Sequence, residues 1–164
     1  MSCEFLNLQE PNEGPYSDLV AVDGKFLFLS GLVSEDFETG ELVSGDIAAE
    51  TRQTLNNLAM ILERYGSDMD HVVRIEVILA DFSERDAMNA EYVKHFDPAH
   101  KPARLCFGGA DLADGCKIEI MARFFKVCRV SAAMSPETSS PVSKSSDTRP
   151  ERNRNLPSTA TKSE

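Results

Sequence analysis

Two residues of opposite charge are the first candidates for chemistry in this chain. Arg104 follows Pro102-Ala103 and opens a short apolar run, and Glu119 lies fifteen positions further on in an alternating segment. The planar guanidinium of an arginine matches the spacing of two carboxylate oxygens, so it can hold an anion through two parallel hydrogen bonds. A neighbouring acid could then position a water or move a proton. The pair therefore predicts a small pocket for an anionic substrate.

Both residues also have an ordinary structural interpretation. A single arginine on a strand is often a surface or salt-bridge residue. Glu119 could form an ion pair with Lys117 or Arg123, which share its side of the strand in a period-two pattern. The residue types alone leave these alternatives open.

The cysteines and histidines give weaker indications of chemistry. Cys106 lies two positions after Arg104, but no histidine stands in a recognisable partner motif, so a covalent thiol intermediate is not expected. The three histidines, His71, His95 and His100, show no ligand spacing with acids or cysteines. We therefore expect no metal site.

The overall composition restricts the class of protein. The 164 residues suffice for one domain with a full hydrophobic core, and a formal net charge of -10 disfavours a nucleic-acid partner. The four cysteines form no C-x-x-C pair, which favours reduced thiols and a cytoplasmic location. No signal-peptide pattern and no apolar run of membrane-spanning length is found, so we expect a soluble protein without a membrane partner.

The composition changes near residue 130. Residues 131–164 contain nine Ser, four Thr and four Pro, and they lack the aromatic side chains needed for a core. We predict a folded domain over residues 1–130 and a disordered Ser/Thr/Pro-rich tail over residues 131–164.

A hairpin and a long helix are predicted in the first half of the domain. Apolar residues at 19–22 and 25–29 flank Asp23-Gly24, a dipeptide that tolerates the positive φ of a two-residue turn. Asp46 can cap a helix that ends before Gly66. The apolar residues of this helix share one face: Ile47, Leu55, Leu58, Ala59 and Leu62.

The second half is predicted to contain three strands and one helix. Residues 71–79 alternate as a half-buried strand does. Its buried side would hold Val73, Ile75, Val77 and Leu79. Ser83 is expected to cap a second helix that extends to Phe96. Two further strands are predicted at residues 104–107 and 117–125.

The predicted order is β, β, α, β, α, β, β, which indicates an α+β domain with a mixed sheet and two helices on one face. In the last strand Glu119 would point to the face without helices. The opposite side of that strand holds Ile118, Ile120, Ala122 and Phe124. Arg104 and Cys106 share a face of their strand, and a common site with Glu119 is geometrically reasonable. The partly apolar open face predicts a subunit contact.

Four segments resemble the Rid family of enamine and imine deaminases, also called the YjgF or RutC-like proteins. They are Gly14-Pro15-Tyr16-Ser17, Leu29-Ser30-Gly31, Pro102-Ala103-Arg104 with Cys106, and Lys117-Ile118-Glu119-Ile120. Residues 51–58 resemble the first helix of the family, and Asn89, Tyr92 and Phe96 resemble its second. The order and spacing together make the resemblance specific over residues 14–125.

The resemblance implies a fold, an assembly and a reaction. It implies a chorismate-mutase-like fold over residues 1–130, a homotrimer, and clefts between neighbouring subunits. The implied reaction is the hydrolysis of 2-imino acids and their enamine tautomers, such as 2-aminoacrylate, 2-iminopropanoate and 2-iminobutanoate, to 2-keto acids and ammonia. It would remove reactive intermediates without a metal or an organic cofactor.

The resemblance also implies roles for seven residues. Arg104 would bind the substrate carboxylate, and Glu119 would position or activate the attacking water. The cleft would be lined by Tyr16, Ser30, Gly31, Asn89 and Cys106.

The chain departs from the family pattern at positions that touch the cleft wall. These are Asp18, Leu32, Gly108 and Gly109. They affect the choice of imine, because one methylene of pocket shape changes discrimination by about 1 to 3 kcal/mol. Two alternatives remain: a non-catalytic trimer that senses small carboxylate metabolites, and an RNA-cleaving translation inhibitor. The acidic composition counts against the second.

Overall fold

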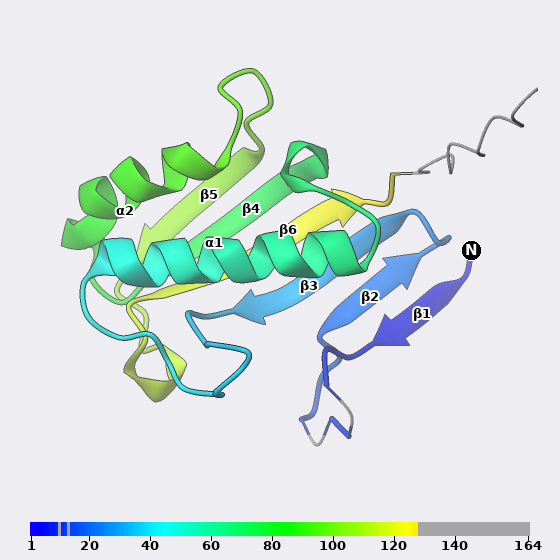
Figure 1. Ribbon diagram of the computed structural model, residues 1–164, viewed down its shortest axis with the longest axis horizontal. Helices are drawn as coiled ribbons and strands as arrows, with labels where there is room; N and C mark the ends of the chain where they lie inside the picture. The colour runs from blue at the N-terminus through cyan, green and yellow to red at the C-terminus, as the bar shows by residue number, and fades with distance from the viewer. Residues whose placement is uncertain (10, 13, 128–164) are drawn as a thin grey trace, which may run out of the picture. The chain divides into compact units, whose positions relative to one another are not determined.

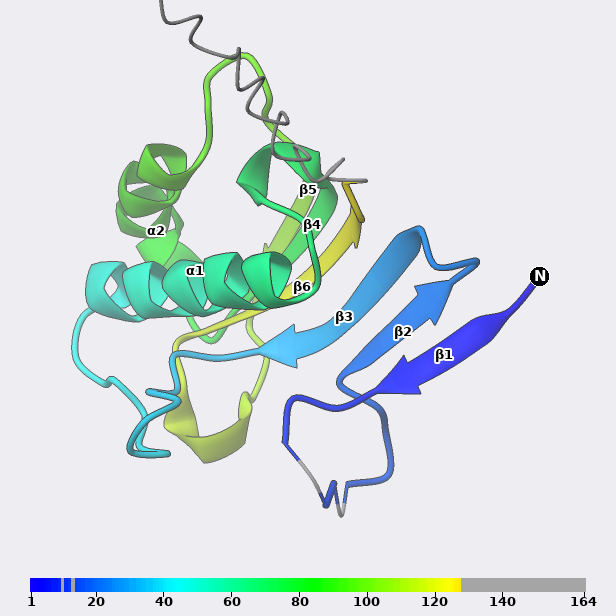
Figure 2. The same cartoon turned by 45° about the vertical axis from the view of Figure 1, so that its right-hand side comes forward.

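The computed structural model describes residues 1–9, 11–12 and 14–127, which form a six-stranded mixed sheet with helices on one face (Figures 1 and 2). The strands are β1 (Cys3–Leu6), β2 (Leu19–Val22), β3 (Phe26–Leu32), β4 (Val72–Leu79), β5 (Ala103–Gly108) and β6 (Ile118–Phe125). The helices are α1 (Ile47–Arg64) and α2 (Arg85–Tyr92), with short 3-10 helices η1 (Met69–His71), η2 (Phe82–Glu84), η3 (Val93–His95) and η4 (Ala113–Gly115). The predicted α+β class is confirmed. The predicted tail over residues 131–164 lies outside the described residues.

The strands follow the order β1-β2-β3-β6-β4-β5 across the sheet. Neighbouring strands run antiparallel except for β4 and β5, which are parallel. The last strand in sequence, β6, therefore lies in the middle of the sheet, between β3 and β4 (Figure 1). This position makes β6 a rigid base for a functional side chain, because it is paired along both edges.

The hairpin between β2 and β3 turns at the predicted dipeptide. Asp23 has φ of 50° and Gly24 has φ of 63°. Two successive residues with positive φ form the turn whose twist matches that of the flanking strands. This prediction is confirmed.

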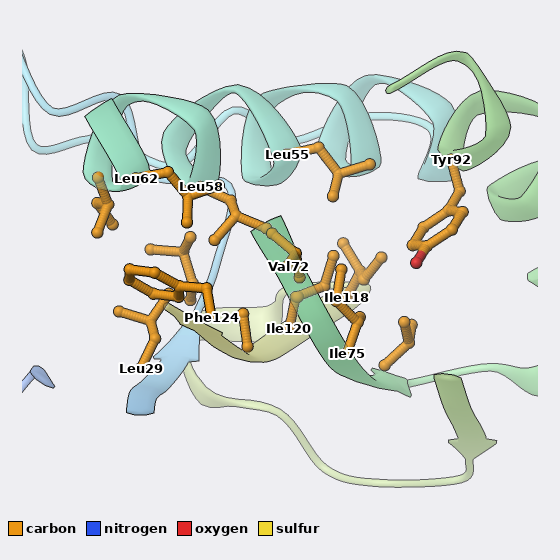
Figure 3. Packing of buried hydrophobic residues seen from close by; sticks show 14 of the residues in the cluster. Leu29, Leu55, Leu58, Leu62, Val72, Ile75, Tyr92, Ile118, Ile120 and Phe124 are labelled. Carbon is orange, nitrogen blue, oxygen red and sulfur yellow. The ribbon is translucent and has the colours of Figure 1, made fainter. Parts of the chain in front are cut away.

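Helix α1 covers the centre of the sheet and supplies much of the core. The Asp46 side chain accepts a hydrogen bond from the Ala49 backbone N–H at 2.8 Å, so the predicted cap is confirmed. Gly66, with φ of 75°, follows the helix end. Figure 3 shows Leu55, Leu58 and Leu62 directed from α1 onto the sheet. All three are fully buried.

Strand β4 departs from the alternation predicted for residues 71–79. Val72 is 3% exposed, whereas Val73 is 44% exposed, so the predicted burial of Val73 is wrong. The pairing of β4 with β6 shifts register between Val72 and Arg74. Such a bulge places one extra residue on the strand and reverses the side on which earlier residues point. From Ile75 onward the predicted alternation holds.

The second helical segment begins differently from the prediction. Ser83 is not the cap: its backbone N–H donates to the Asp81 carboxylate at 2.8 Å. Asp81 precedes η2, and α2 follows without a side-chain cap. An aspartate two residues earlier satisfies the free amide, because its short carboxylate reaches the backbone directly. The segment then continues through η3 as far as His95.

The N-terminal strand β1 was absent from the predicted order. It pairs with β2 at one edge of the sheet, and its side chains are mostly exposed. Because β1 buries no continuous apolar face, its four residues carry no alternating pattern that marks a strand.

The two faces of the sheet differ in character. On the helix face, β6 buries Ile118, Ile120 and Phe124, as predicted. The face without helices, called the open face here, retains large exposed apolar side chains beside charged ones. The exposed apolar residues on it are Phe26, Phe28, Leu105 and Phe107, between 43% and 53% exposed. A surface of this kind is typical of a contact with another protein chain.

Candidate functional site

Arg104 lies on the edge strand β5 and points to the helix face. It pairs in register with Ile75 of β4, whose side chain belongs to the buried core. Its guanidinium carbon lies 4.6 Å from the centroid of the Tyr92 ring, which comes from the end of α2. Within the described part of the chain, no carboxylate forms an ion pair with Arg104. Arg104 is also exposed. Its guanidinium thus lies over an aromatic ring and is available to an external anion.

Glu119 lies on the central strand β6 and points to the open face. It pairs with Ile78 of β4 on that side. A Cβ atom added to Gly31 of β3 would overlap with the Glu119 carboxylate. The carboxylate thus rests directly on the backbone of β3, and only glycine leaves the required space.

The positively charged side chains near Glu119 in sequence form ion pairs with other acids. The Lys117 ammonium lies 2.9 Å from the Glu84 carboxylate, and Arg123 lies 3.4 Å from Glu76. No described cation forms an ion pair with Glu119. The structure therefore does not support the ordinary interpretation of Glu119 as the partner of Lys117 or Arg123.

A single chain does not bring Arg104 and Glu119 together. The register places them three residues apart along β4, with β4 between their strands. Strand spacing and rise put their Cα atoms about 14 Å apart. Their side chains also leave opposite faces of the sheet. A site that contains both residues would therefore require a second copy of the chain.

Cys106 and Asn89 lie on the same side as Arg104. Cys106 is level with Val77 of β4 and packs against the core. Burial raises the pKa of the Cys106 thiol, and the charge of Arg104 acts in the opposite direction. A raised pKa favours the thiol over the thiolate, which disfavours a nucleophilic role. The Asn89 Oδ1 atom is buried without a hydrogen-bond partner among the described residues.

Tyr92 is a residue of this region that the sequence analysis did not assign to the site. It is 6% exposed, and its hydroxyl is buried with no partner in the described structure. Burial raises the pKa of Tyr92 to about 12, against the opposing effect of Arg104. Figure 3 shows its side chain directed from α2 towards the sheet. Tyr92 follows Asn89 by three residues on one helix, so the two side chains share a helix face. This spacing could have indicated Tyr92 as a site residue from the sequence.

Ser30 belongs to β3, the strand that pairs with β6, and its hydroxyl reaches the loop before β2 that carries Tyr16. The Ser30 hydroxyl donates to the Ser17 carbonyl at 2.8 Å, which fixes the residue next to Tyr16. Tyr16 is 63% exposed and borders a hollow of about 500 Å³ with Phe5 and Asn7. Cys106 and Asn89 therefore lie on the side of Arg104, Ser30 and Gly31 lie on the strand next to Glu119, and Tyr16 lies in the loop before β2.

The departures from the family pattern have structural explanations at two positions. The Asp18 carboxylate accepts a hydrogen bond from the Leu8 backbone N–H at 2.8 Å and so anchors the N-terminal loop. A Cβ atom at Gly108 would meet the backbone and Cβ of Phe82 at 2.9 Å and 2.7 Å. A bulkier residue at 108 would therefore displace η2.

A separate cavity of about 560 Å³ lies between the N-terminal loop and α1. Its lining includes Leu8, Asp18, Phe37, Met60 and Arg64, and it contains none of the seven predicted site residues. The described residues include no group of three or more His, Cys, Asp and Glu side chains placed to hold a metal ion. No helix among them has the length and apolarity to cross a membrane.

The arrangement of this chain matches a known family. Residues 8–123 match the family model described as Endoribonuclease L-PSP. The chain belongs to this family. It is the family of the YjgF and RutC proteins, so the resemblance stated from the sequence is confirmed.

Relatives of known name extend this family assignment. A RutC family protein of Pyrococcus horikoshii is 39% identical over 113 residues, which cover 69% of this chain and 88% of the relative. The human 2-iminobutanoate/2-iminopropanoate deaminase is 39% identical over 109 residues, 66% of this chain and 78% of that enzyme. Among solved structures, the yeast protein YEO7 superimposes with a TM-score of 0.69 at 30% identity, covering 77% of this chain and all of that protein. Members of the family thus share this fold, and some are named as imine deaminases.

Proposed function

We propose that this protein is a hydrolytic deaminase that converts reactive 2-imino acids and their enamine tautomers to 2-keto acids and ammonia. In this proposal Arg104 of one copy and Glu119 of a second copy form one site. The observation that carries it is that both charges lack an ion-pair partner in the described chain, although neighbouring charges are paired. The names of the similar deaminases support the substrate class.

The open face supports the association of copies. Phe26 and Phe28 of β3, and Leu105 and Phe107 of β5, leave large apolar areas in contact with water. Burying such side chains releases about 25 cal/mol for each Å² removed from water. We propose a homotrimer, in which each open face packs against the β5 edge of a neighbour. This arrangement would bring Arg104 to Glu119 three times around a ring.

The proposed reaction needs little covalent chemistry from the protein. Arg104 binds the substrate carboxylate through its two parallel N–H groups, and this fixes the position of the iminium carbon. Glu119 orients a water and accepts its proton as the oxygen attacks that carbon. The C–O bond forms and the C=N π electrons return to nitrogen. Glu119 then returns its proton to nitrogen, and the C–N bond breaks as the hydroxyl oxygen forms the C=O bond. The hydroxyl proton passes to Glu119 and on to the released ammonia, giving the 2-keto acid and ammonium.

The remaining predicted residues would shape the cleft. Cys106 and Asn89 would line it beside Arg104, and Ser30, Gly31 and Tyr16 would line it beside Glu119. In this role Gly31 provides the space in which the Glu119 carboxylate lies. Neither metal nor organic cofactor enters the proposed steps.

A coupled assay tests the function directly. A serine or threonine dehydratase generates the imine, and the decay of its absorbance is followed with and without this protein. We expect faster decay with the wild-type chain and little acceleration with Arg104→Ala. Tight binding of a 2-keto acid without acceleration would instead identify a metabolite sensor. Degradation of RNA by the wild type at low salt, and not by Arg104→Ala, would identify a nuclease.

A further inference from the structure

Tyr92 lies directly beneath the functional arginine. The guanidinium carbon of Arg104 is 4.6 Å from the centroid of its ring, and the ring is almost fully buried. We propose that Tyr92 is a positioning residue, whose ring face holds the Arg104 guanidinium in the orientation that binds the substrate carboxylate. The inference rests on the proposed function, because that function defines the carboxylate that the oriented guanidinium binds.

An exposed arginine needs such a support. Its side chain has many rotamers, and fixing it on binding reduces the affinity for an anion. The electron-rich face of an aromatic ring attracts a guanidinium and restricts its position before the ligand arrives. Because no described carboxylate pairs with Arg104, the ring is the contact available to orient it without neutralising its charge.

The ring packs against a neighbouring ring, and the end of α2 that carries it is bound to α1. Phe96 packs against it with a centroid distance of 4.7 Å and an interplanar angle of 31°. The preceding residue, Glu91, accepts hydrogen bonds from two nitrogens of Arg52 on α1, at 2.8 Å and 3.1 Å. These contacts fix the end of α2 against α1. The support under Arg104 is therefore part of the rigid core.

The hydroxyl of Tyr92 can be removed by substitution while the ring is kept. It makes no well-formed hydrogen bond within the described structure, yet it lies close enough to Arg104 that the charge and hydrogen bonding of the guanidinium oppose the burial that raises the pKa of Tyr92 to about 12. The phenol is neutral at physiological pH and cannot serve as a base there. Tyr92→Phe therefore keeps the supporting ring, whereas Tyr92→Leu removes it. The two variants form a matched pair.

Nuclear magnetic resonance of the full chain with labelled arginine tests the support without any substrate. The side-chain signals of Arg104 are assigned with Arg104→Lys. We expect the δ protons to show an upfield ring-current shift in the wild type and in Tyr92→Phe, and to lose it in Tyr92→Leu. If Tyr92→Leu does not fold, Tyr92→Met provides a long apolar side chain without a ring. Unchanged Arg104 signals in the ringless variant would overturn the inference.

Kinetics then test the consequence for binding. We expect Tyr92→Leu to raise KM for the imino acid by about 5- to 30-fold with kcat within about threefold, because uniform binding is lost. Tyr92→Phe should stay within about twofold of the wild type in both constants. In an Arg104→Lys background, Tyr92→Leu should raise KM by less than in the wild type. An equal effect in both backgrounds would show a purely structural role and contradict the inference. The wild type could lack deaminase activity while the ring-current shift of Arg104 is present in it and absent from Tyr92→Leu. In that case the proposed function is wrong, but the positioning of Arg104 by Tyr92 is supported.

Discussion

The contact between Gly31 and Glu119 gives the sharpest prediction for a single substitution. Gly31→Ala would place a Cβ atom where the Glu119 carboxylate now lies, and the carboxylate would have to retreat by about 2 Å to reach ordinary contact. Gly31 has no positive φ, so alanine suits the backbone. A misplacement of this size at a reacting group costs about 100-fold in rate. We therefore expect kcat to fall by about 100-fold.

Stability measurements and a second background make this prediction specific. The overlapping atoms belong to the free end of a flexible side chain, so the free energy of unfolding should change by less than about 1 kcal/mol. The assay is the coupled imine decay, with denaturant unfolding measured on the same preparations. In a Glu119→Gln background, Gly31→Ala should cause little further loss, because the acid it displaces is already gone. Full activity of Gly31→Ala would refute the role assigned to the Glu119 carboxylate. The same would follow if Gly31→Ala lowered kcat as much in the Glu119→Gln background as in the wild type.

Three further predictions concern binding, pH and stability. Arg104→Lys keeps the charge but loses the two parallel hydrogen bonds, so KM in the coupled assay should rise by about tenfold or more. The pKa of Glu91 is lowered to about 2, chiefly by Arg52. The ionised Glu91 therefore stabilises the folded state fully above about pH 4.5, and this stabilisation is lost as the pH falls towards 2. In acid titrations, the free energy of unfolding of Glu91→Gln should depend less on pH between about 4.5 and 2 than that of the wild type. Asp46→Ala removes the hydrogen bond to the Ala49 amide and should cost about 1 kcal/mol in denaturant unfolding, without changing kcat.

The elements with a strong local signal were predictable from the sequence. The Asp23-Gly24 turn requires two positive φ angles, and this dipeptide supplies them. The Asp46 cap and the apolar face of α1 follow from side-chain chemistry and helical period. The alternation in β6 separates its buried side from Glu119 without further information. Each of these features depends on neighbours in sequence.

The features that could not be predicted depend on pairing between distant segments. The bulge near Val73 arises from the register of β4 against β6, and no local residue specifies it. Strand β1 exists because β2 offers a free edge. The position of Arg104 relative to Glu119 depends on which strands are neighbours, and period-two counting within each strand cannot reveal it. The support of Arg104 by Tyr92 likewise joins α2 to β5 and becomes visible only in the fold.

A subunit-mixing experiment determines whether Arg104 and Glu119 of different subunits form one site. Arg104→Ala and Glu119→Gln are each expected to retain only a small residual activity alone. When the two variants are unfolded together and refolded as mixed trimers, about one quarter of the sites should combine Arg104 from one subunit with Glu119 from another. If each site is shared between two subunits, the mixture should recover about one quarter of wild-type activity. A mixture that assembles into hybrid trimers but is no more active than its components would contradict a site shared between two copies.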